Sequence, residues 1–140
     1  MNPKRLILAI LVVFAAVWVS DCLIHGVWLK PTYDATASLW RTEQEMTARI
    51  GWMFGGQFLA ALAFVMLWAK GFAERATLKC GVLYGLFMGL FGQSMTMIFY
   101  VVEPLPGSLA VKWFIAGLGQ SVLLGLLVRC VYKPKPSAQS

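Results

Sequence analysis

Residues 6–29 read LILAILVVFAAVWVSDCLIHGVWL, an apolar run whose strongly polar residues are Ser20, Asp21 and His25. About 20 apolar residues in a helix cover the ~30 Å hydrocarbon core of a bilayer. Three further runs follow at residues 50–69, 78–102 and 109–132. Because open strands would leave backbone groups unpaired in lipid, each run is predicted to be a helix. The sequence thus predicts an all-α, integral membrane four-helix bundle as one domain over residues 1–133, and a disordered tail at residues 134–140.

The composition also favours a membrane protein. Hydrophobic residues make up 59% of the 140 residues and charged residues only 13%, whereas a soluble domain carries about 25% charged residues. A chain this short has too little interior to bury so many apolar side chains, so membrane lipids are the expected surroundings. The net charge of +6 does not indicate nucleic-acid binding, because no basic patch is interleaved with exposed aromatic residues.

The basic residues predict an orientation. Eight of the 12 Lys and Arg residues flank one side of the predicted spans: Lys4, Arg5, Lys70, Arg75, Lys79, Arg129, Lys133 and Lys135. The positive-inside rule then places both termini in the cytoplasm of a bacterial cell, with the protein in the inner membrane. The first run is too long for a signal peptide and lacks a small-residue cleavage site, so it is predicted to be a retained span.

The loop at residues 30–49 is predicted to hold a short amphipathic helix on the periplasmic side. Asp34 could cap this helix at its N-terminus. Further along, Thr42 and Glu45 have the spacing of a capping box. This motif predicts that the helix of the second span begins at Glu43, outside the membrane.

Small residues recur at helical spacing and predict close helix packing, because they let backbones approach one another in lipid. The pattern does not distinguish packing within one bundle from packing between subunits, so a homo-oligomer remains open. The residues concerned are Gly51 and Gly55, then Gly81, Gly85 and Gly89, and finally Gly117, Ser121 and Gly125.

Polar side chains are predicted to meet at one depth of the bundle. With a helix rise of about 1.5 Å per residue, every span contributes at least one of them to a common layer in the outer half. His25 lies one turn beyond Asp21 and would join an outer rim. The predicted ligand-binding residues are Asp21, His25, Gln57, Gln93, Ser94 and Gln120, and the predicted outer-rim residues are Tyr100, Glu103 and Lys112.

An ionised acid within a span costs about 3 kcal/mol on insertion, which makes Asp21 a functional hypothesis. A carboxylate beside amide groups could hold a small cation or a proton, and Asp21 and His25 could share a proton. The alternative is a hydrogen-bonded belt that only fixes helix register. No triad order, phosphate loop, haem-attachment motif or zinc spacing is found, so no catalytic residue or metal site is predicted, and the cofactor stays open.

Three segments of the sequence have the character of family markers: His25-Gly26-Val27-Trp28-Leu29 with Tyr33, Ser38-Leu39-Trp40-Arg41, and Pro104-Leu105-Pro106-Gly107-Ser108-Leu109 with Lys112-Trp113. They resemble a group of small bacterial inner-membrane proteins that are described as uncharacterised transmembrane proteins or domains of unknown function. The resemblance implies a bacterial four-span protein and transfers no activity, catalytic residue or ligand residue.

Three functions follow as hypotheses. The first is a protein that binds a small solute, cation or proton at the polar layer, or helps to move it across the membrane. The second is a non-catalytic accessory subunit that packs against a larger membrane complex through its glycines. The third is a lipid-modifying enzyme that uses Asp21 and His25. The sequence favours the non-enzymatic hypotheses, since a single histidine offers few catalytic arrangements.

Overall fold

The computed structural model describes residues 2–134, with Arg75 described by its backbone alone, and all regular secondary structure in this range is helical. Four helices are long and apolar enough to cross a membrane, which is compatible with a multi-pass membrane protein. These helices are α1 (Pro3–Leu23) with its π-helical continuation η1 (Ile24–Trp28), α4 (Ile50–Gly71), α5 (Leu78–Val102) and α6 (Gly107–Val131). The predicted tail at residues 134–140 lies outside the described residues, apart from Pro134.

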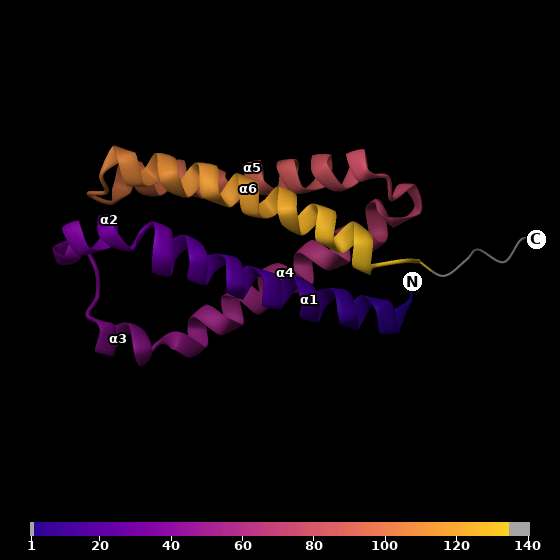
Figure 1. Ribbon diagram of the computed structural model, residues 1–140, viewed down its shortest axis with the longest axis horizontal. Coiled ribbons are helices and arrows are strands. Elements are labelled where there is room, and N and C mark those ends of the chain that lie inside the picture. Colours follow the sequence, from indigo (N-terminus) through magenta and orange to yellow (C-terminus); the bar gives the residue numbers. More distant parts are fainter. Residues whose placement is uncertain (1, 135–140) are drawn as a thin grey trace, which may run out of the picture.

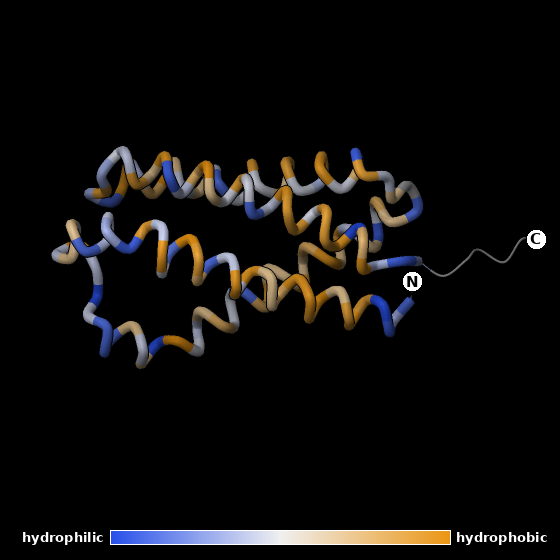
Figure 2. Tube along the Cα trace, in the orientation of Figure 1, coloured by the Kyte–Doolittle hydropathy of each residue, from blue (hydrophilic) through white to orange (hydrophobic). Residues whose placement is uncertain are grey.

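The most extensive contacts link the long helices in the order α5–α6–α1–α4, and α4 also meets α5 through Trp68 and Tyr84. Helices α5 and α6 run antiparallel along each other, α1 packs against α6, and α4 crosses α1 (Figure 1). The first and last described residues lie at one end, here called the terminal end, and the short helices α2 and α3 lie at the other, here called the loop end (Figure 1). Hydrophilic residues concentrate towards these two ends, and the stretches between them are mainly hydrophobic (Figure 2).

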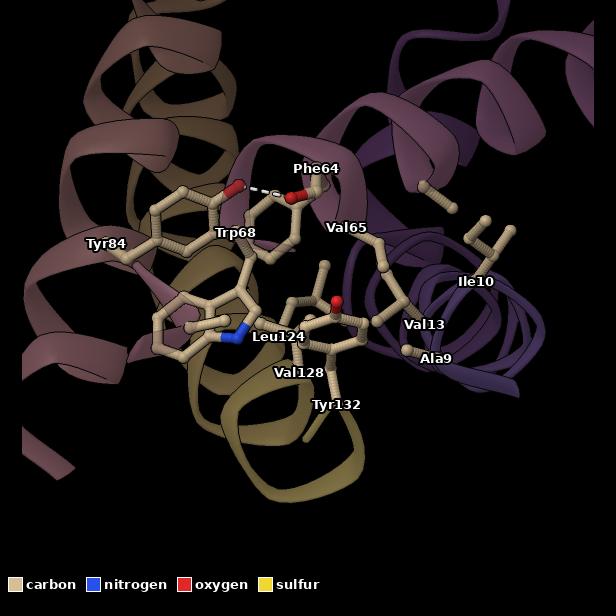
Figure 3. Close-up of a cluster of buried hydrophobic side chains, with 12 residues drawn as sticks. Ala9, Ile10, Val13, Phe64, Val65, Trp68, Tyr84, Leu124, Val128 and Tyr132 are labelled. Atoms are coloured by element: carbon tan, nitrogen blue, oxygen red, sulfur yellow. Dashed lines mark hydrogen bonds between the residues drawn. The ribbon is translucent and has the colours of Figure 1, made fainter. Parts of the chain in front are cut away.

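The apolar core occupies the terminal half of the bundle, where all four long helices contribute to it. Trp68 on α4 packs edge-on against Tyr84 on α5, with ring centroids 5.3 Å apart. The Tyr84 hydroxyl donates a hydrogen bond to the backbone carbonyl of Phe64 (Figure 3). The buried residues of this cluster are Ala9, Ile10, Val13, Ala61, Phe64, Val65, Trp68, Ala73, Tyr84, Leu124, Val128 and Tyr132. The core therefore fastens the helices at the terminal end.

Glycines set the close approach of α5 to α6. A Cβ atom on Gly81 would lie 3.0 Å from the carbonyl oxygen of Gly125, and one on Gly125 would lie 2.9 Å from the Cα of Gly85. Gly89 and Gly117 face the same interface, against Ser121 and Gln93 respectively. Cβ atoms on Gly51 and Gly55 would meet no described atom within 4 Å. Gly51 and Gly55 therefore mediate no close helix contact among the described residues.

The loop at the loop end is more segmented than the sequence predicted. It contains α2 (Lys30–Ala35), a 3-10 turn (Ala37–Leu39) and α3 (Glu43–Thr47). The prediction that Asp34 caps a helix was wrong, because α2 already begins at Lys30 and Asp34 lies inside it. Pro31 in the first turn of α2 favours this start, since its missing N–H would have no helical partner there. The Lys30 ammonium instead bonds the Asp34 carboxylate at 2.9 Å.

The capping box at Thr42 and Glu45 is confirmed, and both of its hydrogen bonds are present. However, α3 ends at Thr47 and α4 begins at Ile50, so the prediction of a second span that is continuous from Glu43 was wrong. Arg49 adopts a non-helical backbone with φ −111° and ψ 6°. Its guanidinium donates to the Glu45 carbonyl at 2.9 Å, which satisfies an acceptor that the end of α3 leaves free.

Gly125→Ala should destabilise the protein by about 1–3 kcal/mol, because the added methyl group overpacks against the α5 backbone. Gly119→Ala on the same helix is the matched control, since its Cβ would meet no described atom within 4 Å. Unfolding in mixed micelles, followed by circular dichroism, measures both variants. Equal stabilities for the two variants would contradict this packing.

The capping box also makes a pH-dependent prediction. The hydrogen bonds from the Thr42 side chain and backbone hold the pKa of Glu45 below its ordinary value of 4.5. The cap therefore supports α3 above that value and loses its effect as the pH falls through the lowered pKa. Thr42→Ala should raise the pKa of Glu45 in a carboxyl ¹³C NMR titration, whereas Thr47→Ala should leave it unchanged.

Candidate functional site

The carboxylate of Asp21 joins three helices by hydrogen bonds. Gln57 on α4 donates its amide Nε2 to Oδ2 of Asp21 at 2.6 Å, and Gln120 on α6 donates its Nε2 to Oδ1 at 2.7 Å. Gln120 Nε2 also donates to Ser20 Oγ at 2.7 Å. The Ser20 hydroxyl donates in turn to the carbonyl of Ala16 at 2.6 Å. We call Ser20, Asp21, Gln57 and Gln120 the Asp21 network.

Gln120 uses both of its N–H groups within the Asp21 network, whereas one buried acceptor of the network has no partner. A primary amide has two N–H bonds, and Gln120 directs one to Asp21 and one to Ser20. Gln57 spends an N–H on Asp21, which turns its carbonyl Oε1 away from that carboxylate. This oxygen is buried and has no hydrogen-bond partner among residues 2–134. A buried acceptor left in this state is costly.

No cation of the described residues neutralises Asp21. The single ion pair within residues 2–134 joins Lys30 to Asp34. Asp21 itself is half-buried, and its two described side-chain partners are neutral amides. The network therefore solvates a carboxylate without supplying a counter-charge.

Two members of the predicted polar layer do not reach Asp21. Gln93 accepts a bond from the Thr96 hydroxyl at 2.7 Å and packs against Gly117. The Ser94 hydroxyl is exposed and donates to the carbonyl of Phe91 at 2.7 Å. Because α5 packs along α6 and not along α1, its glutamine meets α6 instead of the carboxylate. The sequence predicts a polar layer with side chains from four helices, but only α1, α4 and α6 contribute to the hydrogen bonds around Asp21.

His25 belongs to a second hydrogen-bonded chain. Its Nδ1 lies 2.6 Å from the Tyr33 hydroxyl, and the indole Nε1 of Trp113 donates to the same hydroxyl at 2.7 Å. Since Trp113 donates to the phenol oxygen, the phenol proton is free to be donated to an unprotonated Nδ1. Burial raises the pKa of Tyr33 above its ordinary value of 10.0, the Trp113 bond opposes this shift, and the charge of Asp21 adds to it.

The predicted outer-rim residues make separate contacts. Lys112 donates to the Thr32 hydroxyl at 3.0 Å and so fastens α6 to α2. Tyr100 is exposed, and its hydroxyl lies close to Gly107. Glu103 follows α5, where its backbone N–H bonds the Phe99 carbonyl at 2.7 Å. Of the three, only Lys112 contacts the loop helices by a hydrogen bond within residues 2–134.

A pocket of about 960 Å³ opens beside the Asp21 network, between α1, the N-terminal part of α4 and the loop helices. Both Asp21 and Gln57 line it. Tilted stacking of Trp18 on Phe54, with centroids 4.4 Å apart, holds α1 to α4 at its base. The lining residues are Trp18, Asp21, Cys22, His25, Gly26, Tyr33, Asp34, Ala37, Trp40, Arg41, Thr42, Glu43, Met46, Met53, Gln57 and Trp113.

Sequence reasoning missed several residues of this site. Trp18, Asp21, His25 and Trp28 have the spacing of one helix face, but Trp28 does not line the pocket. The π-helical turn η1 holds an extra residue and rotates Trp28 away, with Leu29 N–H bonding Ile24 O at 2.8 Å. The hydrogen bond between Tyr33 and Trp113 joins residues 80 positions apart, so no local sequence signal predicts it, although both residues belong to the segments that carry the resemblance.

Tyr33→Phe should loosen α2 from α6, because Trp113 and His25 both lose their partner, at a cost of about 1 kcal/mol. Hydrogen–deuterium exchange of the peptide that covers residues 29–36 should become faster. Tyr100→Phe is the control, because no hydrogen bond of the Tyr100 hydroxyl is found among residues 2–134. Unchanged exchange in Tyr33→Phe would show that this chain of bonds does not hold the loop.

The chain matches no protein-family model, no curated protein and no solved structure. The resemblance to uncharacterised bacterial inner-membrane proteins therefore stays a prediction.

Proposed function

We propose that this protein is a small polytopic membrane protein that binds a small cationic solute or a proton at Asp21 and helps to move it. One observation carries the proposal. The Asp21 carboxylate is held by two neutral amides, lacks a cationic partner among residues 2–134 and lines a pocket of about 960 Å³.

Electrostatics support a positively charged ligand. Taking a charge out of water costs several kcal/mol per ion, roughly, unless an opposite charge compensates it. The amides of Gln57 and Gln120 offset part of this cost by solvating the carboxylate. A cation that enters the pocket would offset the remainder, because attraction between opposite charges is stronger in a medium of low dielectric constant. An anion would meet repulsion at the same place.

The orientation is part of the proposal. The terminal end carries Lys4, Arg5, Lys70, Lys79, Arg129 and Lys133, whereas the pocket lies at the loop end. With the positive-inside rule, the terminal end faces the cytoplasm and the pocket faces the periplasm of a bacterial inner membrane. A ligand would then enter from outside the cell.

A second candidate is an accessory subunit of a larger membrane complex or a homo-oligomer. Gly51 and Gly55 of α4 support it, because added Cβ atoms there would meet no described atom within 4 Å. A partner helix could approach the backbone along this open stretch. The lipid-modifying enzyme has less support, since the described partner of His25 Nδ1 is Tyr33 and not Asp21.

Asp21→Asn tests the main proposal, because it keeps the shape of the side chain and removes its charge. Isothermal titration calorimetry of the protein in phosphatidylcholine nanodiscs would compare sodium, potassium, methylammonium and tryptamine, the last an aromatic amine. Proteoliposomes with an entrapped pH dye would measure proton entry. Losing an opposite charge should weaken binding of at least one cation about tenfold or more, or remove the proton flux.

Glu103→Gln is the matched control, since it neutralises a carboxylate of the same end outside the large pocket. Circular dichroism would show that both variants remain folded. The proposal fails when neither the binding of any of these cations nor the proton flux differs between Asp21→Asn and Glu103→Gln.

A further inference from the structure

We infer that the large pocket takes a protonated amine attached to an apolar body of aromatic size. The inference rests on the proposed function, because it names the class of cation that Asp21 would receive. Four features of the pocket carry it: its size, its aromatic walls, its charge and the unpaired acceptor of Gln57.

The size of the pocket argues for an organic ligand. Pockets that bind small organic molecules commonly measure about 300–1,000 Å³, and this pocket measures about 960 Å³. An inorganic ion or a proton would occupy only a small part of such a space. The pocket therefore has room for a ligand that carries an organic body as well as a charge that meets Asp21.

The walls are suited to an apolar cation. Four aromatic side chains from α1, α2, the loop and α6 line the pocket, and two methionines complete its α3 and α4 side: Trp18, Tyr33, Trp40, Trp113, Met46 and Met53. Trp and Tyr faces attract cations through their ring quadrupoles. Methionine side chains adapt to irregular ligands and make favourable contacts with aromatic rings. Such walls would hold an aromatic body beside a positive charge.

The charged residues of the pocket also favour a cationic ligand. Its acidic lining residues are Asp21, Asp34 and Glu43, and its only always-charged basic lining residue within the described range is Arg41. Asp34 is already paired with Lys30. Asp21 lies within the long helix α1, whereas Asp34 and Glu43 lie on the short loop helices. The loop acids can attract a cation, and Asp21 can hold it.

The unpaired oxygen of Gln57 distinguishes between kinds of organic cation. Its Oε1 is a buried acceptor without a partner among residues 2–134, and the residue lines the pocket. Because Oε1 itself is buried, the Gln57 amide has to turn before a ligand in the pocket can reach it. A protonated primary amine has three N–H donors, so it can then bond Oε1 while its charge faces Asp21. A quaternary ammonium has no N–H and would leave the oxygen unpaired. The site is therefore expected to prefer the protonated amine.

Three ligands with one indole body separate charge from hydrogen bonding. All three keep the indole N–H. At the end of the side chain, tryptamine carries charge and N–H donors, its N,N,N-trimethyl derivative carries charge without a donor, and tryptophol carries an O–H donor without charge. Calorimetry with the wild-type protein in phosphatidylcholine nanodiscs should show tryptamine binding about tenfold or more tightly than either of the others, the loss expected for a hydrogen bond to a charged group. Equal affinities for all three would overturn the inference.

Gln57→Leu adds an independent test. It should weaken tryptamine about tenfold and remove the preference over the trimethyl derivative, because the acceptor is gone. Gln93→Leu is the matched control, since Gln93 lies on α5 and does not line the pocket, and it should keep the preference. A preference that survives in a folded Gln57→Leu protein would also overturn the inference.

The amine could come from a free molecule or from an aminophospholipid headgroup. Repeating the titration in phosphatidylethanolamine nanodiscs distinguishes them: weaker apparent binding identifies the headgroup as a competing occupant, and unchanged binding identifies a free amine. Both results keep the protonated amine. Asp21-dependent binding of sodium, potassium or methylammonium without any preference for tryptamine would overturn this inference and leave the proposed function standing.

Discussion

A carboxylate placed inside an apolar bundle must find hydrogen-bond donors, and the loop half of this protein is arranged around that requirement. Asp21 on α1 receives one amide N–H from α4 and one from α6. These bonds connect α1 to both of its neighbours at a level where the buried apolar cluster no longer reaches. A neutral belt could fix helix register in the same way. A neutral belt would not need an ionisable group, whose insertion into a membrane costs about 3 kcal/mol, and this cost is the physical reason for proposing a function for Asp21.

The two halves of the bundle are stabilised by different interactions. In the terminal half, Trp68, Tyr84 and Val128 pack in a core that all four long helices share (Figure 3). In the loop half, α4 crosses away from α1 towards α3, and the helices meet through the Asp21 network and the Trp18–Phe54 pair. The glycine contact keeps α5 and α6 together along their length. The pocket opens in the half that has the smaller apolar core, and a ligand there would not disturb the main packing.

The loop helices form the walls of the pocket at the loop end. Lys112 bonds Thr32, and Trp113 bonds Tyr33, so α6 holds α2 over the pocket beside His25. On the opposite wall, α3 has its own capping box and is separated from α4 by a non-helical Arg49. One wall is therefore tied to the bundle by long-range hydrogen bonds, and the other is stabilised mainly within itself. A protonated amine between α2 and α3 would contact both walls as well as the Asp21 carboxylate.

The sequence by itself determined the four long helices, the Thr42–Glu45 capping box and the position of Asp21 as an acid within an apolar run, because each depends on the pattern of residues along one segment. It also paired Asp21 with Gln57 and Gln120 through depth alone. Depth could not decide which face of a helix meets which neighbour. Only the tertiary structure turned Gln93 towards Gly117, replaced the expected cap at Asp34 by α2, and brought Tyr33 to Trp113. These features depend on helix rotation and on the order of packing, with α6 between α5 and α1, and the hydrophobic pattern of a lipid-facing helix carries little information about either.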